Sequence, residues 1–336
     1  MEYKSVKGFS GWAQTGFLFA FLGLGFILAG GAQLLMTLQI LPAGTPITDT
    51  DAMMKAMLAP QNVGMARAIQ VVGTFLLLFV PALLWSLVSN GKNMFWLGFN
   101  KYVNVKQIGI GFLIILAAGF AAVPLADLSK NIVAHFPSLD ATAKRMEDLY
   151  NLQALALSNL KSFPEYITAL FIMAFFPAMF EEVFFRGTIQ NLLVKWWQKP
   201  MVAIFITSVI FSLIHLSVYL FLSRLALGFV LGLMFYYTKN IWVNIIAHFL
   251  NNAIALTGLY IMRNKPGKNN LDALDPHVHW SISLLCFAAL IGLFYLLKKY
   301  SVVNRAKIYA KENMLIAAAD PFSSFANNKI DSIGTE

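Results

Sequence analysis

The sequence predicts an all-α protein whose helices cross a membrane several times, and three observations carry that prediction. Of its 336 residues, 58% are hydrophobic and 12% are charged, whereas a soluble domain carries about a quarter charged residues. The mean hydropathy is +0.67. The apolar residues form long runs, and about 20 of them cross a bilayer as a helix. Such a chain cannot cover its surface with polar groups, so we expect most of that surface to face lipid.

Eight apolar runs are the candidate spans of one helix bundle. They are Trp12–Leu41, Ala68–Val88, Ile108–Leu125, Phe163–Phe180, Met201–Phe221, Leu222–Thr238, Ile241–Met262 and Trp280–Leu297. The first run follows Lys4 and Lys7 in the manner of a signal peptide, but it is about twice as long as an ordinary signal-peptide core. We therefore expect it to be retained as a spanning helix.

These runs divide the chain into four parts. Residues 1–162 carry three spans and extracytoplasmic loops, including a predicted surface helix over Ala141–Leu160. Residues 163–262 carry four spans with the functional residues. Residues 263–299 form a loop and the last span, and residues 300–336 a cytoplasmic tail.

The positions of the lysines predict the orientation of the bundle. With eight spans both termini lie on one side, and the loop between the second and third spans holds Lys92, Lys101 and Lys106 without an acidic residue. Loops rich in Lys and Arg stay in the cytoplasm. We therefore expect cytoplasmic termini and, because no eukaryotic targeting feature is visible, a bacterial cytoplasmic (inner) membrane.

Charge and cysteine content exclude several classes of partner. The net charge of +9 does not come from a basic cluster interleaved with aromatics on a soluble segment, so we expect no nucleic-acid partner. The single cysteine, Cys286, excludes a disulfide within the chain and a multi-cysteine zinc site. The expected partners are the lipid bilayer and a peptide or protein substrate. No pattern sets an oligomeric state.

The first group of polar residues at membrane depth is the run Glu181-Glu182-Val183-Phe184-Phe185-Arg186. Glu182 and Arg186 are four residues apart, so on a helix they face each other as an ion pair. Glu181 is rotated about 100° away and is free to act. Pro177 removes a backbone donor just before the pair, which favours a kink.

Two histidines form the second and third groups. His215 follows Phe211 by four residues, and His248 and Asn252 share one helical face. Polar groups are costly in the bilayer centre, so we expect these three helices to bring their polar groups together or around water. The predicted site is Glu181, His215, His248 and Asn252.

These residue types favour hydrolysis of a peptide bond by activated water. Glu181 would take a proton from water and later return it, and His215 would position that water. His248 and Asn252 could donate to a developing oxyanion. No cofactor is expected.

Three alternatives use the same residues. Glu181, His215 and His248 could instead hold a catalytic zinc ion, although the H-E-x-x-H spacing is absent. The cavity could bind a peptide without cutting it, as in an immunity or scaffold protein. A transporter would use the polar groups as a relay, but they cluster in the second half of the chain without a matching set in the first.

The three motifs resemble those of a known family. E-E-x-x-x-R stands at Glu181, Glu182 and Arg186, F-x-x-x-H at Phe211 and His215, and H-x-x-x-N at His248 and Asn252. In order and separation they resemble the CPBP (CAAX protease and bacteriocin-processing, or ABI) family of intramembrane glutamic proteases, which includes the type II CAAX prenyl endopeptidases. The similarity covers about Pro164 to Leu256 and includes Gly228 and Gly232, where a neighbouring helix could pack closely.

The resemblance implies an eight-helix bundle with a cavity open to the cytoplasmic side. It implies that Glu181 activates water with His215 as its partner, and that His248 and Asn252 stabilise the oxyanion. Glu182, Arg186 and Phe211 would be supporting residues.

Overall fold

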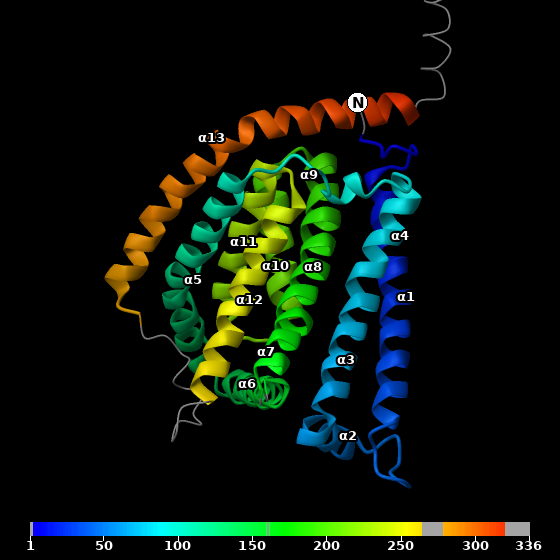
Figure 1. Ribbon diagram of the computed structural model, residues 1–336, viewed down its shortest axis with the longest axis vertical. Helices are drawn as coiled ribbons and strands as arrows, with labels where there is room; N and C mark the ends of the chain where they lie inside the picture. Colours follow the sequence, from blue (N-terminus) through cyan, green and yellow to red (C-terminus); the bar gives the residue numbers. More distant parts are fainter. Residues whose placement is uncertain (1–2, 159, 161, 264–277, 320–336) are drawn as a thin grey trace, which may run out of the picture.

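The computed structural model describes residues 3–158, 160, 162–263 and 278–319, so parts of the predicted 263–299 loop and 300–336 tail lie outside the described residues. Within the described ranges the chain is built of helices, apart from an isolated antiparallel bridge between Lys4 and Ser10. The expected all-α membrane protein is confirmed. Both described ends lie on one face of the bundle, where α1 begins and the last helix ends (Figure 1); we call it the terminal face.

The first half of the chain forms a pair of antiparallel spans, a third span, a short helix and a longer surface helix. Its helices are α1 (Gly11–Leu38), α2 (Thr50–Leu58), α3 (Val63–Thr74), α4 (Val80–Ser89), α5 (Val105–Ala134) and α6 (Pro137–Leu157). A π-helical segment, Phe75–Phe79, joins α3 to α4 in one span. Polar caps start the long helices: Ser10 accepts from the Ala13 amide, and Asn104 and Gln107 form a capping box.

The segment that carries both glutamates is one continuous 35-residue run, Phe163–Trp197, which we call the central helix. It passes through α7 (Phe163–Ala169), α8 (Phe176–Glu182) and α9 (Asn191–Trp197), with π-helical segments at Leu170–Phe175 and Val183–Gln190 between them. The first π segment ends just before Pro177, where the sequence predicted a kink. The glutamates thus lie in the middle of the helix, and the predicted span end at Phe180 is wrong.

The remaining helices are α10 (Pro200–Ile214), α11 (Phe221–Thr238), α12 (Ile241–Arg263) and α13 (Trp280–Ala319). Within the described ranges, seven helices are long and apolar enough to cross a membrane. The fifth predicted span, Met201–Phe221, is not among them, because α10 ends at Ile214. Its 15 residues reach about 22 Å, less than the roughly 30 Å of hydrocarbon.

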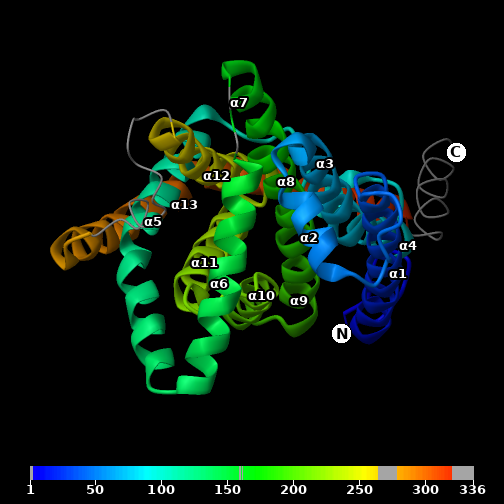
Figure 2. The same cartoon turned by 90° about the horizontal axis from the view of Figure 1, so that it is seen from below.

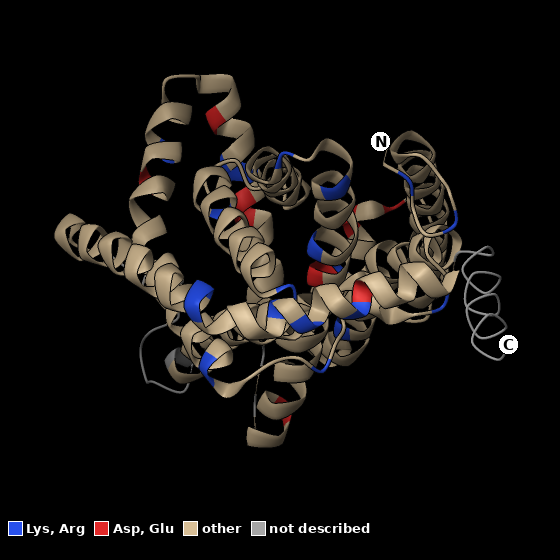
Figure 3. Ribbon diagram, turned by 90° about the horizontal axis from the view of Figure 1, so that it is seen from above, with Lys and Arg blue, Asp and Glu red and all other residues tan. Residues whose placement is uncertain are grey.

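The helices form two groups joined by surface helices. α1, α3 and α4 stand beside a larger group of α5 and α7–α12 (Figure 1), and α6 crosses under that group on the face opposite the terminal face (Figure 2). α13 runs on past Leu297 across the terminal face and carries several lysines and arginines there (Figure 3). Phe19, Phe26 and Leu285 are about 70% exposed, as expected of lipid-facing positions.

Polar contacts tie α6 to the short loop between α10 and α11. The Tyr219 hydroxyl lies 2.6 Å from an Asp140 carboxylate oxygen, and the Ser217 hydroxyl donates to Glu147 over 3.0 Å. Irregular backbone at membrane depth is stable where protein buries it. α6 provides that cover, so the predicted surface helix is present and contacts the loop that follows His215.

Candidate active site

Glu182 and Arg186 form the fixed centre of the site. Both side chains are fully buried, and an Arg186 guanidinium nitrogen lies 2.7 Å from Glu182 Oε1. A second nitrogen of Arg186 donates to the Gly228 carbonyl over 3.1 Å. The guanidinium also lies over the Phe211 ring at 4.7 Å. The ion pair predicted from the i,i+4 spacing is confirmed, and Phe211 forms one wall of its enclosure.

Two residues of α12 complete the bonding of Glu182. His248 Nδ1 lies 2.8 Å from Glu182 Oε1, and the Asn244 amide donates to Glu182 Oε2 over 3.1 Å. The same amide donates to the Leu231 carbonyl of α11 over 2.7 Å. A carboxylate only accepts hydrogen bonds, so His248 donates from Nδ1 and turns Nε2 away from Glu182. We refer to Glu182, Arg186, Asn244 and His248 as the Glu182 cluster.

Glu181 is turned toward a cavity beside the helix and remains open. Its Oε2 is buried and has no hydrogen-bond partner among the described residues. The nearest charged partner is His248, whose Nε2 lies 3.8 Å from Glu181 Oε2. This distance is too long for a direct hydrogen bond. Glu182 therefore orients the imidazole that faces the Glu181 carboxylate.

His215 closes the site from the end of α10. Its ring lies 4.7 Å from the Phe211 ring, and Phe211 in turn lies 6.2 Å from His248. Its Nδ1 lies 2.7 Å from the Phe211 carbonyl. Leu216, the next residue, has φ of 53°, a left-handed conformation unfavourable for a branched side chain. This turn ends α10 at the histidine.

A cavity of about 880 Å³, which we call the α1 groove, leads to Glu181 and His215. One wall is the face of α1 from Trp12 to Gln33, and the others are formed by the end of α3 with the Phe75–Phe79 segment and by the chain from α8 to α10. Apart from the two ionisable residues and a few neutral polar ones, its lining is apolar. Trp12 and Trp196 pack edge to face at its end near the terminal face. The groove can accept an apolar chain and bring it to a carboxylate.

The residues of the zinc alternative do not form a ligand set. Among the residues the structure describes, no group of three or more His, Cys, Asp and Glu side chains is arranged to hold a metal ion, and this includes Glu181, His215 and His248. One nitrogen of His248 is already bonded to Glu182.

Sequence reasoning brought Glu181, His215 and His248 together, but it missed one member of the site. Asn252 follows His248 by one turn of α12 and shares its face, as predicted. Asn244 precedes His248 by one turn, and its bonds to Glu182 and Leu231 were not anticipated. The repeated spacing N-x-x-x-H-x-x-x-N was the signal that could have identified it.

The predicted close packing at the glycines is found on α11. A Cβ atom built on Gly232 would lie 2.6 Å from Ile204 of α10 and 2.9 Å from Gln190, and one on Gly228 would lie 3.2 Å from Phe211. Both glycine carbonyls accept hydrogen bonds, from Gln190 and Arg186 respectively. The glycines let polar side chains of the central helix reach the α11 backbone.

Comparison with known proteins places the similarity on this part of the chain. Residues 163–254 match the family described as type II CAAX prenyl endopeptidase Rce1-like, which confirms the recognition made from the three motifs. The matched segment contains both glutamates, His215 and the α12 motif. No curated protein and no solved structure matches the chain.

Proposed function

From the type II CAAX prenyl endopeptidase family found over residues 163–254, we propose that this multi-pass membrane protein is an intramembrane endopeptidase that hydrolyses a peptide bond with water activated by Glu181. The observation that carries the proposal is the contrast between two adjacent carboxylates. Glu182 is bonded on both oxygens, whereas Glu181 keeps a buried oxygen without a partner beside an imidazole nitrogen. A general base needs such an open position.

The proposed reaction runs through this chain's own residues. A water between Glu181 and the scissile carbonyl gives its proton to the carboxylate, and its oxygen attacks the carbonyl carbon. The Asn252 amide donates to the negatively charged carbonyl oxygen, and a doubly protonated His248 donates to it from Nε2 while its Nδ1–H stays on Glu182. His215 orients the water. The tetrahedral intermediate collapses as Glu181 returns the proton to the leaving amine. Glu182 and Arg186 hold His248 and the helix in place.

The α1 groove supports a substrate with an apolar part. It reaches from the tryptophans near the terminal face to Glu181, so an apolar chain could enter from that side. This agrees with a cavity open to the cytoplasm if the termini are cytoplasmic. We place the protein in the bacterial cytoplasmic membrane.

The test compares membranes that contain the wild-type protein with membranes that contain Glu181→Gln. Mass spectrometry of newly formed protein termini should detect a set of cleavage products in the wild type, and Glu181→Gln should remove that set. Asp127→Asn, an exposed carboxylate on α5, is the matched control and should keep it. A phenotype that survives Glu181→Gln without any cleavage product would instead indicate the peptide-binding scaffold.

Metal dependence is tested on the same membranes. The proposal expects that a chelator leaves the cleavage products unchanged and that purified protein holds no stoichiometric zinc. Chelator-sensitive cleavage with one bound zinc ion would overturn the metal-free mechanism.

A further inference from the structure

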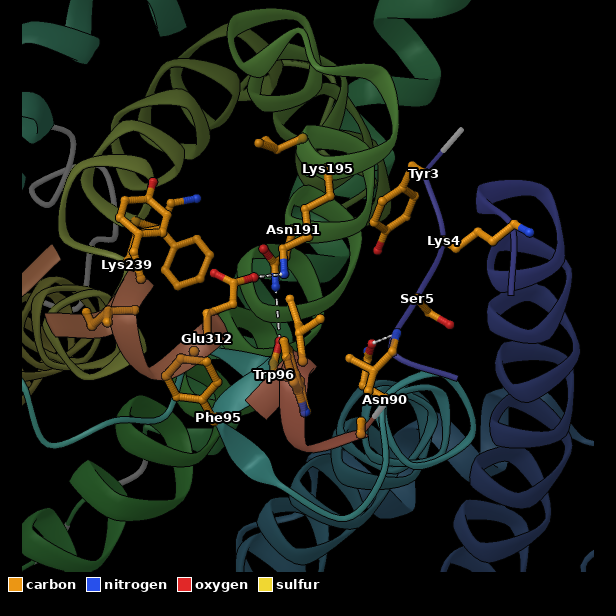
Figure 4. A pocket seen from close by; sticks show the side chains of 18 of the residues that line it. Tyr3, Lys4, Ser5, Asn90, Phe95, Trp96, Asn191, Lys195, Lys239 and Glu312 are labelled. Carbon is orange, nitrogen blue, oxygen red and sulfur yellow. Dashed lines mark hydrogen bonds and ion pairs between the residues drawn. The ribbon is translucent and has the colours of Figure 1, made fainter. Parts of the chain in front are cut away.

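A second cavity, separate from the α1 groove, lies at the terminal face. It measures about 750 Å³ and is enclosed by the N-terminal segment, the turn at Phe95 and Trp96, α9, the end of α11 and the last turns of α13 (Figure 4). Neither Glu181 nor His215 lines it. We call it the terminal pocket, and the proposed hydrolysis makes no use of it.

Positive charge gathers at the terminal pocket. Lys4, Lys195 and Lys239 line it, and Glu312 is the acidic side chain in its lining. Arg305 lies outside the lining but near enough to act on the charge of Lys239. Lys195 uses that acid, since its Nζ lies 2.5 Å from Glu312 Oε1 (Figure 4). Lys239 and Arg305 both lie over the Tyr236 ring, at 5.4 and 5.6 Å. Within the described residues, Lys239 has no ion-pair partner.

The environment of Lys239 indicates that its charge is poorly compensated. Burial lowers its pKa to about 8, with Lys195 and Arg305 acting in the same direction and Glu312 opposing them. The residue ends α11 in the left-handed conformation, with φ of 53°. An anion bound in the pocket would stabilise the charged form of Lys239 against burial and the neighbouring cations.

The lining of the pocket indicates what kind of anion it takes. Tyr3, Trp96 and Tyr309 stand around it, and such aromatic side chains are enriched at the level of lipid headgroups. Val6, Ile308 and Ile316 provide apolar contacts in the same cavity. Basic pockets on this kind of surface bind phosphate-bearing headgroups, and the apolar lining would meet the start of an acyl chain. A free phosphate would leave that apolar lining unused.

We propose that the terminal pocket binds the phosphate-bearing headgroup of an anionic phospholipid, with Lys239 as the main cationic contact and the Lys195–Glu312 pair as a modulator. The site is independent of peptide hydrolysis, and its test does not depend on cleavage. The bound headgroup would hold the last turns of α13 against α9 and α11.

The experiment titrates the full-length protein in a neutral detergent with dioctanoylphosphatidylglycerol and follows the thermal unfolding midpoint. The midpoint should rise with this lipid and not with dioctanoylphosphatidylcholine. Lys239→Asn removes the charge but suits the left-handed turn, and it should weaken apparent affinity about fivefold, as expected for one cation at a membrane surface. The matched control is Lys199→Asn, an exposed lysine outside the pocket, which should leave affinity unchanged.

A second variant predicts a change in the opposite direction. Glu312→Gln removes the acid and frees Lys195, so affinity for phosphatidylglycerol should rise by about fivefold. A merely structural role of these residues would not raise affinity. Equal response to both lipids, equal affinity of Lys239→Asn and the wild type, or weaker binding by Glu312→Gln would overturn the proposal. An equal shift with inorganic phosphate alone would also overturn the lipid assignment.

Discussion

Unlike Glu181, which lines the α1 groove, Glu182 is fully buried among its hydrogen-bonding partners. The Glu182 cluster fills the space between the central helix, α11 and α12, and each Glu182 oxygen accepts a hydrogen bond. On the groove side, Glu181 has an unpartnered oxygen and faces a largely apolar cavity. Two neighbouring residues of the same type thus have different surroundings, because the helix turns one toward a packed interface and the other toward a cavity.

The largest expected effect is the loss of stability when Glu182 is replaced. Glu182→Gln leaves the Arg186 charge buried without its partner, which should destabilise the protein by about 3–5 kcal/mol. Glu181→Gln breaks no hydrogen bond of the described structure and should change stability by less than about 0.5 kcal/mol. Unfolding by sodium dodecyl sulfate in mixed micelles measures both variants. Similar losses of stability in the two variants would contradict the distinction between a fixed and an open carboxylate.

The next effect concerns Asn244 as a positioning residue. Asn244→Ala removes a hydrogen bond to the buried Glu182 carboxylate and should destabilise the protein by about 1.5–3 kcal/mol. Because Glu182 holds His248, the pH dependence of cleavage should also change. Asn251→Ala, one residue before Asn252 on the same helix and outside the Glu182 cluster, controls for loss of an amide. An Asn244→Ala protein that loses stability but keeps the wild-type pH profile would show that Asn244 does not act through His248.

The smallest effect tests the glycine contact that lets Gln190 reach α11. Gly232→Ala places a methyl group 2.6 Å from Ile204, and such overpacking typically costs about 1–3 kcal/mol. Gly292→Ala on α13 has open space around it and should be neutral or slightly stabilising, since alanine favours a helix over glycine. The thermal midpoints of the two variants provide the comparison. Equal midpoints would mean that α10 and α11 can move apart at Gly232 without a loss of protein stability.

The sequence predicted the gathering of polar groups well because membrane burial limits where such groups can lie. Glu182 and Arg186 are paired as their spacing required, and Glu181, His215 and His248 come together around Phe211. Their chemical roles stay predictions. The bond between His248 and Glu182 was not foreseen, because helical spacing describes contacts along one helix and not between the central helix and α12.

Helix lengths were harder to predict than helix positions. Hydropathy does not show that α10 ends at Ile214, because apolar residues continue beyond it and the helix is followed by a left-handed turn at Leu216. Nor does it show that α13 continues to Ala319, since charged residues from Lys298 onward suggest the end of a span. That continuation is stabilised by contacts such as the bonds of Gln107 to Ser301 and Asn304. These depend on tertiary structure.

The π-helical segments on both sides of α8 have a consequence for how this helix tolerates changes in length. An extra residue in a packed α-helix rotates everything after it by about 100°, which would turn the apolar face of α9 away from its neighbours. A π-helical turn accommodates one extra residue locally, and such turns stand before Phe176 and after Glu182. The direction in which the glutamates point can therefore be set independently of the segments before and after α8. The ends of the helix stay in register with the rest of the bundle, so insertions and deletions confined to these turns could re-aim the glutamates without repacking the membrane domain.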